Sequence, residues 1–103
     1  HGLSTLPTKI AISLDVIDST LKEVLNGNDN LLSDDISNAY TFHILTFLSK
    51  SYNRRGWVQQ FHLGALRNNN KRLLTKLGAD TGFDSIGDYT HGESLSNFLN
   101  HLD

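Results

Sequence analysis

Residues 56–64 have the sequence GWVQQFHLG, and this stretch decides the fold class. Between its two glycines lie residues rich in strand-forming types, which predicts a short strand over 57–63. Side chains alternate along a strand, so the polar pair Gln60 and His62 shares one face with Val58. Such a pair is unusual in a packed core, and it is expected where a barrel strand opens into an active site. The opposite face carries Trp57, Gln59, Phe61 and Leu63.

Helical patterns precede this strand. Residues 8–26 carry two patterns, a strand-like alternation of Ile10, Ile12 and Leu14 and a longer helical spacing from Ile10 to Leu25. The longer pattern favours a helix from about Leu14 onward, and Gly27 is suited to end it because glycine tolerates positive φ. The clearest helix is predicted over residues 34–53, where Ser33 can cap the N-terminus. Its apolar stripe is predicted to consist of Ile36, Tyr40, Ile44, Phe47 and Leu48.

Loops and shorter helices follow the strand. Residues 64–70 are predicted to be irregular, and a short helix is expected over 69–77, capped by Asn68 or Asn69. A structured loop is expected over 80–88. A final amphipathic helix is predicted from the spacing of Leu95, Phe98, Leu99 and Leu102.

One predicted strand among helices indicates an α/β fold, mostly helical within this chain. A single strand cannot form a sheet, so we expect its partner strands outside the chain and interpret the chain as a fragment. His1 in place of an initiating Met favours the same interpretation, and a processed secreted protein is the alternative. The predicted regions are a leading helix and loop (1–33), a helix (34–55), a barrel strand (57–63), an active-site loop with a short helix (64–88) and a final helix (89–103).

Composition argues against several classes of function. The formal net charge of −2 argues against a nucleic-acid partner. No apolar run approaches the roughly 20 residues that cross a membrane, and no signal-peptide pattern is present. The chain has no cysteine, so any metal ligand in it must be His, Asp or Glu. This composition fits a reducing compartment, and we expect a cytoplasmic protein.

Two side chains near the end of the predicted strand are candidates for chemistry. His62 can ligate a divalent metal or move a proton near neutral pH, and the alternative is a hydrogen-bonded structural histidine. Arg67 can hold a carboxylate through two parallel hydrogen bonds, or it can pair with a nearby Asp as an ordinary loop arginine. No H-x-H or H-E-x-x-H motif occurs, so the sequence predicts no complete metal site within this chain. Surface or packing roles are predicted for His1, His43, His91 and His101.

Two longer stretches closely resemble the signature of bacterial uronate isomerases. They are RRGWVQQFHLGALRNNN at residues 54–70 and LGADTGFDSIGD at residues 77–88. The resemblance implies a fragment of a (β/α)8 TIM barrel of metal-dependent hydrolase type, with residues 57–63 as the fifth barrel strand. It also implies a divalent metal, zinc in many members, at the barrel mouth.

The resemblance further implies roles for individual residues. His62 matches an active-site histidine that faces metal and substrate, which makes it the expected catalytic residue. Arg67 matches the motif arginine of the loop above the strand and is the expected substrate-binding residue. The family's principal metal ligands, an H-x-H on the first strand and an Asp on the last, are not in this chain. Relatives also tend to carry a Ser-Asp-His run where residues 4–8 here are STLPT, a departure from the family pattern.

The predicted function is therefore a uronate isomerase, an aldose–ketose isomerase acting on hexuronates. It would interconvert D-glucuronate with D-fructuronate and D-galacturonate with D-tagaturonate, and the fragment alone is expected to be inactive. The alternative is a small non-catalytic helical interaction module, which a native chain of about this size would favour. Homo-oligomerisation is left open.

Overall fold

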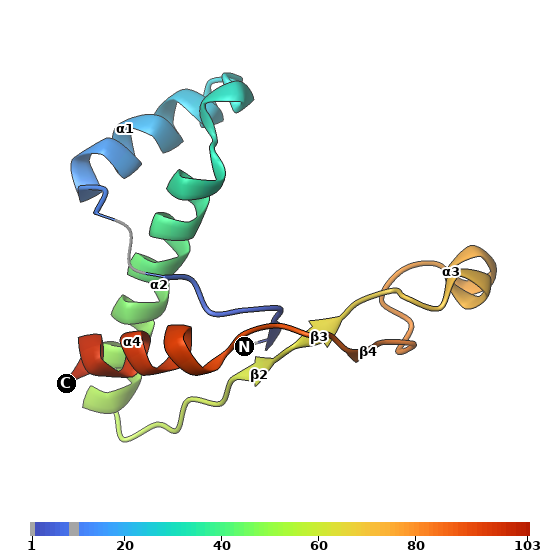
Figure 1. The fold of residues 1–103 in the computed structure, drawn as a ribbon. Coiled ribbons are helices and arrows are strands. Elements are labelled where there is room, and N and C mark those ends of the chain that lie inside the picture. Colours follow the sequence, from blue (N-terminus) through green and yellow to red (C-terminus); the bar gives the residue numbers. More distant parts are fainter. Residues whose placement is uncertain (1, 9–10) are drawn as a thin grey trace.

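Four α-helices carry most of the regular structure in the computed structural model, which describes residues 2–8 and 11–103 (Figure 1). They are α1 (Leu14–Leu25), α2 (Asp34–Arg54), α3 (Lys71–Leu77) and α4 (Gly92–Leu102). The other elements are β1 (Gly2–Leu3), β2 (His62–Leu63), β3 (Ala65–Leu66), β4 (Ser85–Ile86) and the 3-10 helix η1 (Asp29–Leu31). Each helix expected from the periodicity of the sequence is present, with bounds close to those predicted.

Side-chain caps define where the two longest helices begin. Ser13 Oγ accepts a hydrogen bond from the Val16 amide at 3.4 Å, and Ser33 Oγ accepts one from the Ile36 amide at 3.3 Å. Each bond satisfies an amide that has no intrahelical partner in the first turn. The predicted N-cap at Ser33 is thus confirmed. Beyond the end of α2, Gly56 adopts a φ of 67°, which favours glycine.

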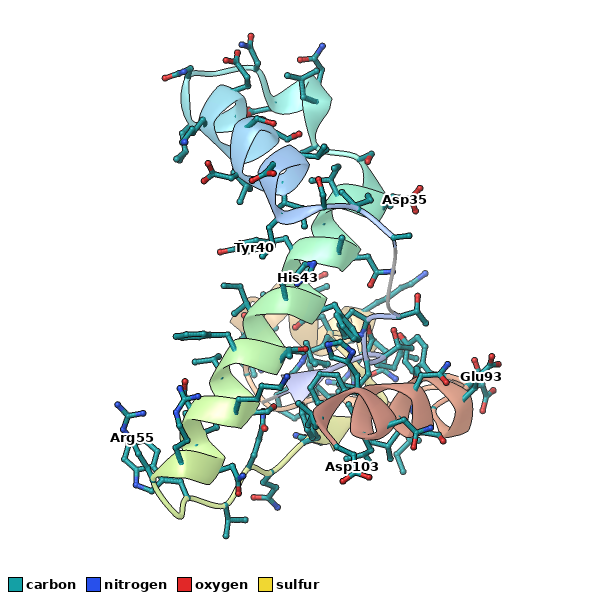
Figure 2. The ribbon with its side chains drawn as sticks, turned by 90° about the vertical axis from the view of Figure 1, so that its left-hand side faces the viewer. Asp35, Tyr40, His43, Arg55, Glu93 and Asp103 are labelled. Carbon is teal, nitrogen blue, oxygen red and sulfur yellow. The ribbon has the colours of Figure 1, made fainter. Side chains whose placement is uncertain are left out.

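Helix α2 has apolar side chains on two faces, and this chain covers only one of them. The covered face contains Ile36, Ala39, Phe42 and Leu45. On the other face Phe47 is 64% exposed, and Figure 2 shows Tyr40 pointing away from α4. The prediction that the stripe through Tyr40, Ile44 and Phe47 forms the buried face of α2 was therefore wrong within this chain. Helical spacing finds both apolar faces, but it does not tell which one a neighbouring element covers.

The core lies where α2, α4 and the segment after β1 meet. Phe42 and Phe98 are its largest fully buried side chains, and their rings meet edge to face at 5.8 Å between centroids. Phe61 contacts Phe98 in the same way at 5.7 Å, which brings the segment before β2 onto this core. Leu6 and Leu45 complete the buried cluster. This packing holds the segment after β1 and the segment before β2 against α2 and α4.

Strand β2 is shorter than predicted and has a partner within the chain. Only His62–Leu63 of the predicted strand 57–63 forms a ladder, and it pairs in parallel with Gly2–Leu3 of β1. The expectation that every partner strand lies outside the chain was wrong. Two residues, one of them glycine, leave no period-2 pattern by which β1 could be found in the sequence.

The extended segment before β2 nevertheless has the two faces predicted for it. Gln59, Phe61 and Leu63 are partly buried, whereas Gln60 and His62 are exposed and Val58 is 94% exposed. Phe61 and Leu63 pack against the core cluster. At the start of the segment the alternation fails, because Trp57 is exposed and stacks on Tyr52 of α2 at 5.8 Å.

Residues 64–88 contain a hairpin that the sequence did not reveal. Strands β3 and β4 pair antiparallel, with Ala65 opposite Ile86 and Leu66 opposite Ser85. Helix α3 lies between them, and Asn70 Oδ1 caps it by accepting a hydrogen bond from the Leu73 amide at 3.1 Å. The predicted cap at Asn68 or Asn69 was wrong by one or two residues, since both of these side chains bond across the hairpin instead.

The chain is extended for its length. Its radius of gyration is 16.3 Å, whereas a compact domain of this length would have about 13 Å. Helix α3 and the hairpin project sideways from the helical body, and α1 lies near the start of α2 (Figure 1). No helix in the described part of the chain combines the length and hydrophobicity that crossing a membrane needs.

Candidate active site at the end of strand β2

His62 is exposed at the end of the extended segment and lines a hollow of about 240 Å³. The other lining residues come from the turn after β2 and from the hairpin: Leu63, Gly64, Ala65, Asp84, Ser85 and Ile86. Within residues 2–8 and 11–103 the imidazole forms no hydrogen bond or ion pair. Both ring nitrogens are therefore open to a ligand in this hollow, which is what proton transfer at a bound molecule requires.

Gly64 follows β2 directly and forms three backbone hydrogen bonds, two to the chain at the end of β1 and one to the residue after β4. Its amide donates to the carbonyls of Leu3 and Ser4 at 3.1 and 3.2 Å, and its carbonyl accepts from the Gly87 amide at 2.8 Å. Its φ is 85°, and a Cβ built there would lie 2.9 Å from Nε2 of His91. Only glycine satisfies both the backbone conformation and the close approach of the imidazole.

Replacing Gly64 by Ala is expected to destabilise the whole protein more than replacing Gly56 by Ala. Both positions have positive φ, which costs about 1–2 kcal/mol for a residue with Cβ. Gly64→Ala adds the contact with His91, worth about 1–3 kcal/mol of overpacking, whereas a Cβ at Gly56 meets nothing within 4 Å. Urea denaturation of the two variants measures the difference. Equal losses would show that His91 moves aside without cost.

Arg67 follows the hairpin strand β3 and pairs with Asp84. Its Nη1 lies 2.9 Å from Asp84 Oδ2, and the two side chains are 49% and 27% exposed. Pairing with a nearby Asp was one of the two alternatives that the sequence left open for Arg67. A guanidinium has five N–H donors, so one bond to Asp84 leaves donors for a second carboxylate.

Asparagine side chains close the loop around Arg67. Asn68 has a φ of 55°, its amide donates to Asp84 Oδ1 at 3.0 Å, and its Oδ1 accepts from the Asp80 amide at 3.0 Å. The Asn69 side chain donates to the Ser85 hydroxyl. The three consecutive asparagines therefore stabilise the loop and start α3.

Asp84 is the residue that links the two predicted site residues. It lines the same hollow as His62 and forms an ion pair with Arg67. A loop rich in Asp and Gly was predicted at 80–88, but the sequence carries no signal for which Asp would reach Arg67, because that contact depends on the β3–β4 register.

The remaining histidines that the structure describes do not line this hollow, although His91 lies behind one of its lining residues. His43 and His101 contact the ring of Phe42 at 6.2 and 5.0 Å, in agreement with packing roles. His91 precedes α4 and lies against Gly64, and His1 is outside the described residues. Across residues 2–8 and 11–103, no three His, Asp or Glu side chains gather closely enough to hold a metal ion.

Comparison with known proteins places this chain in a family. The family model for glucuronate isomerase matches residues 1–103, which is the whole chain. The chain belongs to the glucuronate isomerase family. The stretch 54–88, which contains the hollow, is therefore part of a glucuronate isomerase sequence.

Individual relatives agree with this assignment. A uronate isomerase from Shouchella clausii is 43% identical over 108 residues, covering 100% of the chain and 21% of the relative. One from Flavobacterium johnsoniae is 65% identical over 60 residues, covering 58% of the chain and 13% of the relative. The crystal structure of uronate isomerase from Thermotoga maritima superposes with a TM-score of 0.78 at 28% identity, covering 100% of the chain and 22% of that structure. The chain thus spans about a fifth of the length of the relatives that it matches from end to end.

Proposed function

We propose that the whole protein containing this chain is a uronate isomerase, which interconverts D-glucuronate with D-fructuronate and D-galacturonate with D-tagaturonate. The observation that carries the proposal is the match of the glucuronate isomerase family over all 103 residues. This match favours an isomerase over a helical interaction module. Because the chain is about a fifth of its relatives' length, the activity belongs to the whole protein, and residues 1–103 alone are inactive.

The whole protein is further proposed to be a (β/α)8 barrel, to which this chain contributes two neighbouring strands. The parallel pair β1–β2 supports this, because parallel strands need a crossover connection, and here α1 and α2 lie between the strands. The uncovered apolar face of α2 and the extended shape of the chain also support it, since neighbouring β/α units would cover such surfaces.

His62 and Arg67 have separate roles in the proposed reaction. Isomerisation moves the carbon-bound proton from C2 of the aldose to C1 through an enediol. The hydroxyl proton on O2 is transferred to O1, so the C2 hydroxyl becomes the ketose carbonyl and the C1 carbonyl becomes a hydroxyl. His62, with its free imidazole in the hollow, gives or takes a proton at this end of the substrate. Arg67 binds the C6 carboxylate, which sets the substrate's register relative to His62.

A divalent metal, zinc, is proposed as the cofactor, with its main ligands in other parts of the whole protein. The residues described here do not form such a site by themselves, because a catalytic zinc needs three protein ligands and no such group occurs among them. Of the two possible ligands among the described residues that line the hollow, His62 is the proposed one, because both carboxylate oxygens of Asp84 are bonded to the Arg67 loop.

The test is an assay of the whole protein with D-glucuronate and D-galacturonate, following ketose formation. Ketose is expected with the purified protein, to be lost after treatment with a chelator and to return when zinc is added. A protein that is folded and metal-loaded yet forms no ketose from either hexuronate would refute the proposal.

A further inference from the structure

The loop that carries Arg67 is closed by side chains from a segment 16 or 17 residues further along the chain. Asp84 uses both carboxylate oxygens for this closure: Oδ1 accepts from the Asn68 amide at 3.0 Å, and Oδ2 accepts from Arg67 Nη1 at 2.9 Å. A carboxylate bonded through both oxygens has its plane fixed. The direction in which it holds the guanidinium is therefore fixed as well.

This geometry restricts Arg67 without using up its donors. A free arginine side chain loses rotamer freedom when it binds a ligand, which costs about 0.5–1.5 kcal/mol for a rotamer-rich side chain. In this loop the bond to Asp84 has already removed part of that freedom. The Arg67 side chain is still 49% exposed, so its remaining N–H groups are accessible to an incoming carboxylate.

We propose that Asp84 is a positioning residue, which holds Arg67 in the orientation that binds the substrate carboxylate. The inference rests on the proposed function, because it takes the ligand of Arg67 to be a hexuronate carboxylate. Asp84 also lines the hollow that contains His62, so it links the position of the carboxylate-binding group to the position of the proton-transfer group.

Holding the hairpin together does not by itself require Asp84. The β3–β4 ladder and the bond from Asn69 to Ser85 join the same two segments independently. Partly exposed ion pairs also contribute little to stability. Removing the charge of Asp84 should therefore leave the hairpin in place and release Arg67, which separates positioning from folding.

The experiment uses the whole protein with Asp84→Asn, which keeps the size of the side chain and removes its charge. We expect KM for D-glucuronate to rise about tenfold, with kcat lowered less and the melting temperature nearly unchanged. Asp84→Glu, which keeps the charge, should recover part of the loss. Asp80→Asn is the matched control, because Asp80 lies in the same segment and only its backbone amide bonds to the loop. A loss with Asp80→Asn equal to that of Asp84→Asn would overturn the proposal.

A double-mutant cycle tests whether Asp84 acts through Arg67. In an Arg67→Ala background, Asp84→Asn should have little further effect on KM, whereas independent roles would give additive losses and overturn the proposal. Crystal structures of the Asp84→Asn and Asp80→Asn variants give a readout that needs no activity. The Arg67 side chain should lose its single orientation only in the first. If the wild-type protein forms no ketose, the proposed function fails, and this structural comparison alone then decides whether Asp84 positions Arg67.

Discussion

Replacing His62 by Asn in the whole protein is expected to lower turnover by roughly 10²-fold or more, the scale for a lost acid–base group. The side chain is exposed at the hollow and has no bonding partner among the described residues. Asn keeps a polar side chain of similar bulk and cannot transfer a proton near neutral pH. Steady-state kinetics with D-glucuronate measure the effect, alongside a thermal unfolding curve for the same preparation.

The control is His43→Asn, which changes a half-buried histidine on α2 that contacts Phe42 and does not line the hollow. It should alter stability modestly and leave kcat near the wild-type value. The interpretation of His62 would be wrong if His62→Asn kept its activity while its melting temperature collapsed, since that would make the histidine structural.

Replacing Phe98 by Ala is expected to destabilise the protein by about 3–5 kcal/mol, the usual loss for a buried aromatic ring. Phe98 is 0% exposed and meets the rings of both Phe42 and Phe61 edge to face. Its removal leaves a cavity between α4, α2 and the segment that leads into β2. Because that segment ends at His62, lowered activity at temperatures below unfolding should accompany the loss of stability.

Urea denaturation of the Phe98→Ala variant gives the change in unfolding free energy. Asn97→Ala is its control, since Asn97 is the exposed neighbour on α4 and its replacement should change stability by less than about 0.5 kcal/mol. A loss below about 1 kcal/mol for Phe98→Ala would show that other parts of the protein refill the cavity and that this core is not independent.

The helices could be predicted from the sequence because their signals are local. Ser33 caps α2 three residues before the amide that it binds, and apolar spacing alone locates α4. Which face of α2 is buried could not be predicted, because both faces are apolar and the choice depends on where α4 and the N-terminal segment dock. The same limit applies to Asn70, whose neighbours Asn68 and Asn69 are equally good caps until the hairpin engages them.

The sequence nominates His62 and Arg67 as site residues, which stays a prediction, but it does not indicate how the two are connected. His62 and Arg67 follow from a strand that ends in polar residues and from the family resemblance. Asp84 could not be found in this way, because its contact with Arg67 spans 17 residues and depends on the register of two strands of two residues each. Strand β1 was missed for a similar reason, since its pairing with β2 is a long-range contact without a local pattern.

The pairing of Gly2 with His62 has a consequence for the order in which the chain folds. It closes a loop roughly three times longer than the one closed when Ala65 pairs with Ile86, which adds about 1 kcal/mol of closure entropy. Once α1 and α2 have formed, they shorten the flexible chain between β1 and β2 and lower the entropic cost of closing this loop. We therefore expect the parallel contact to form after these two helices. The hairpin that carries Arg67 can therefore be assembled while the strand end that presents His62 is still without its neighbour, and the two halves of the site mature at different stages of folding.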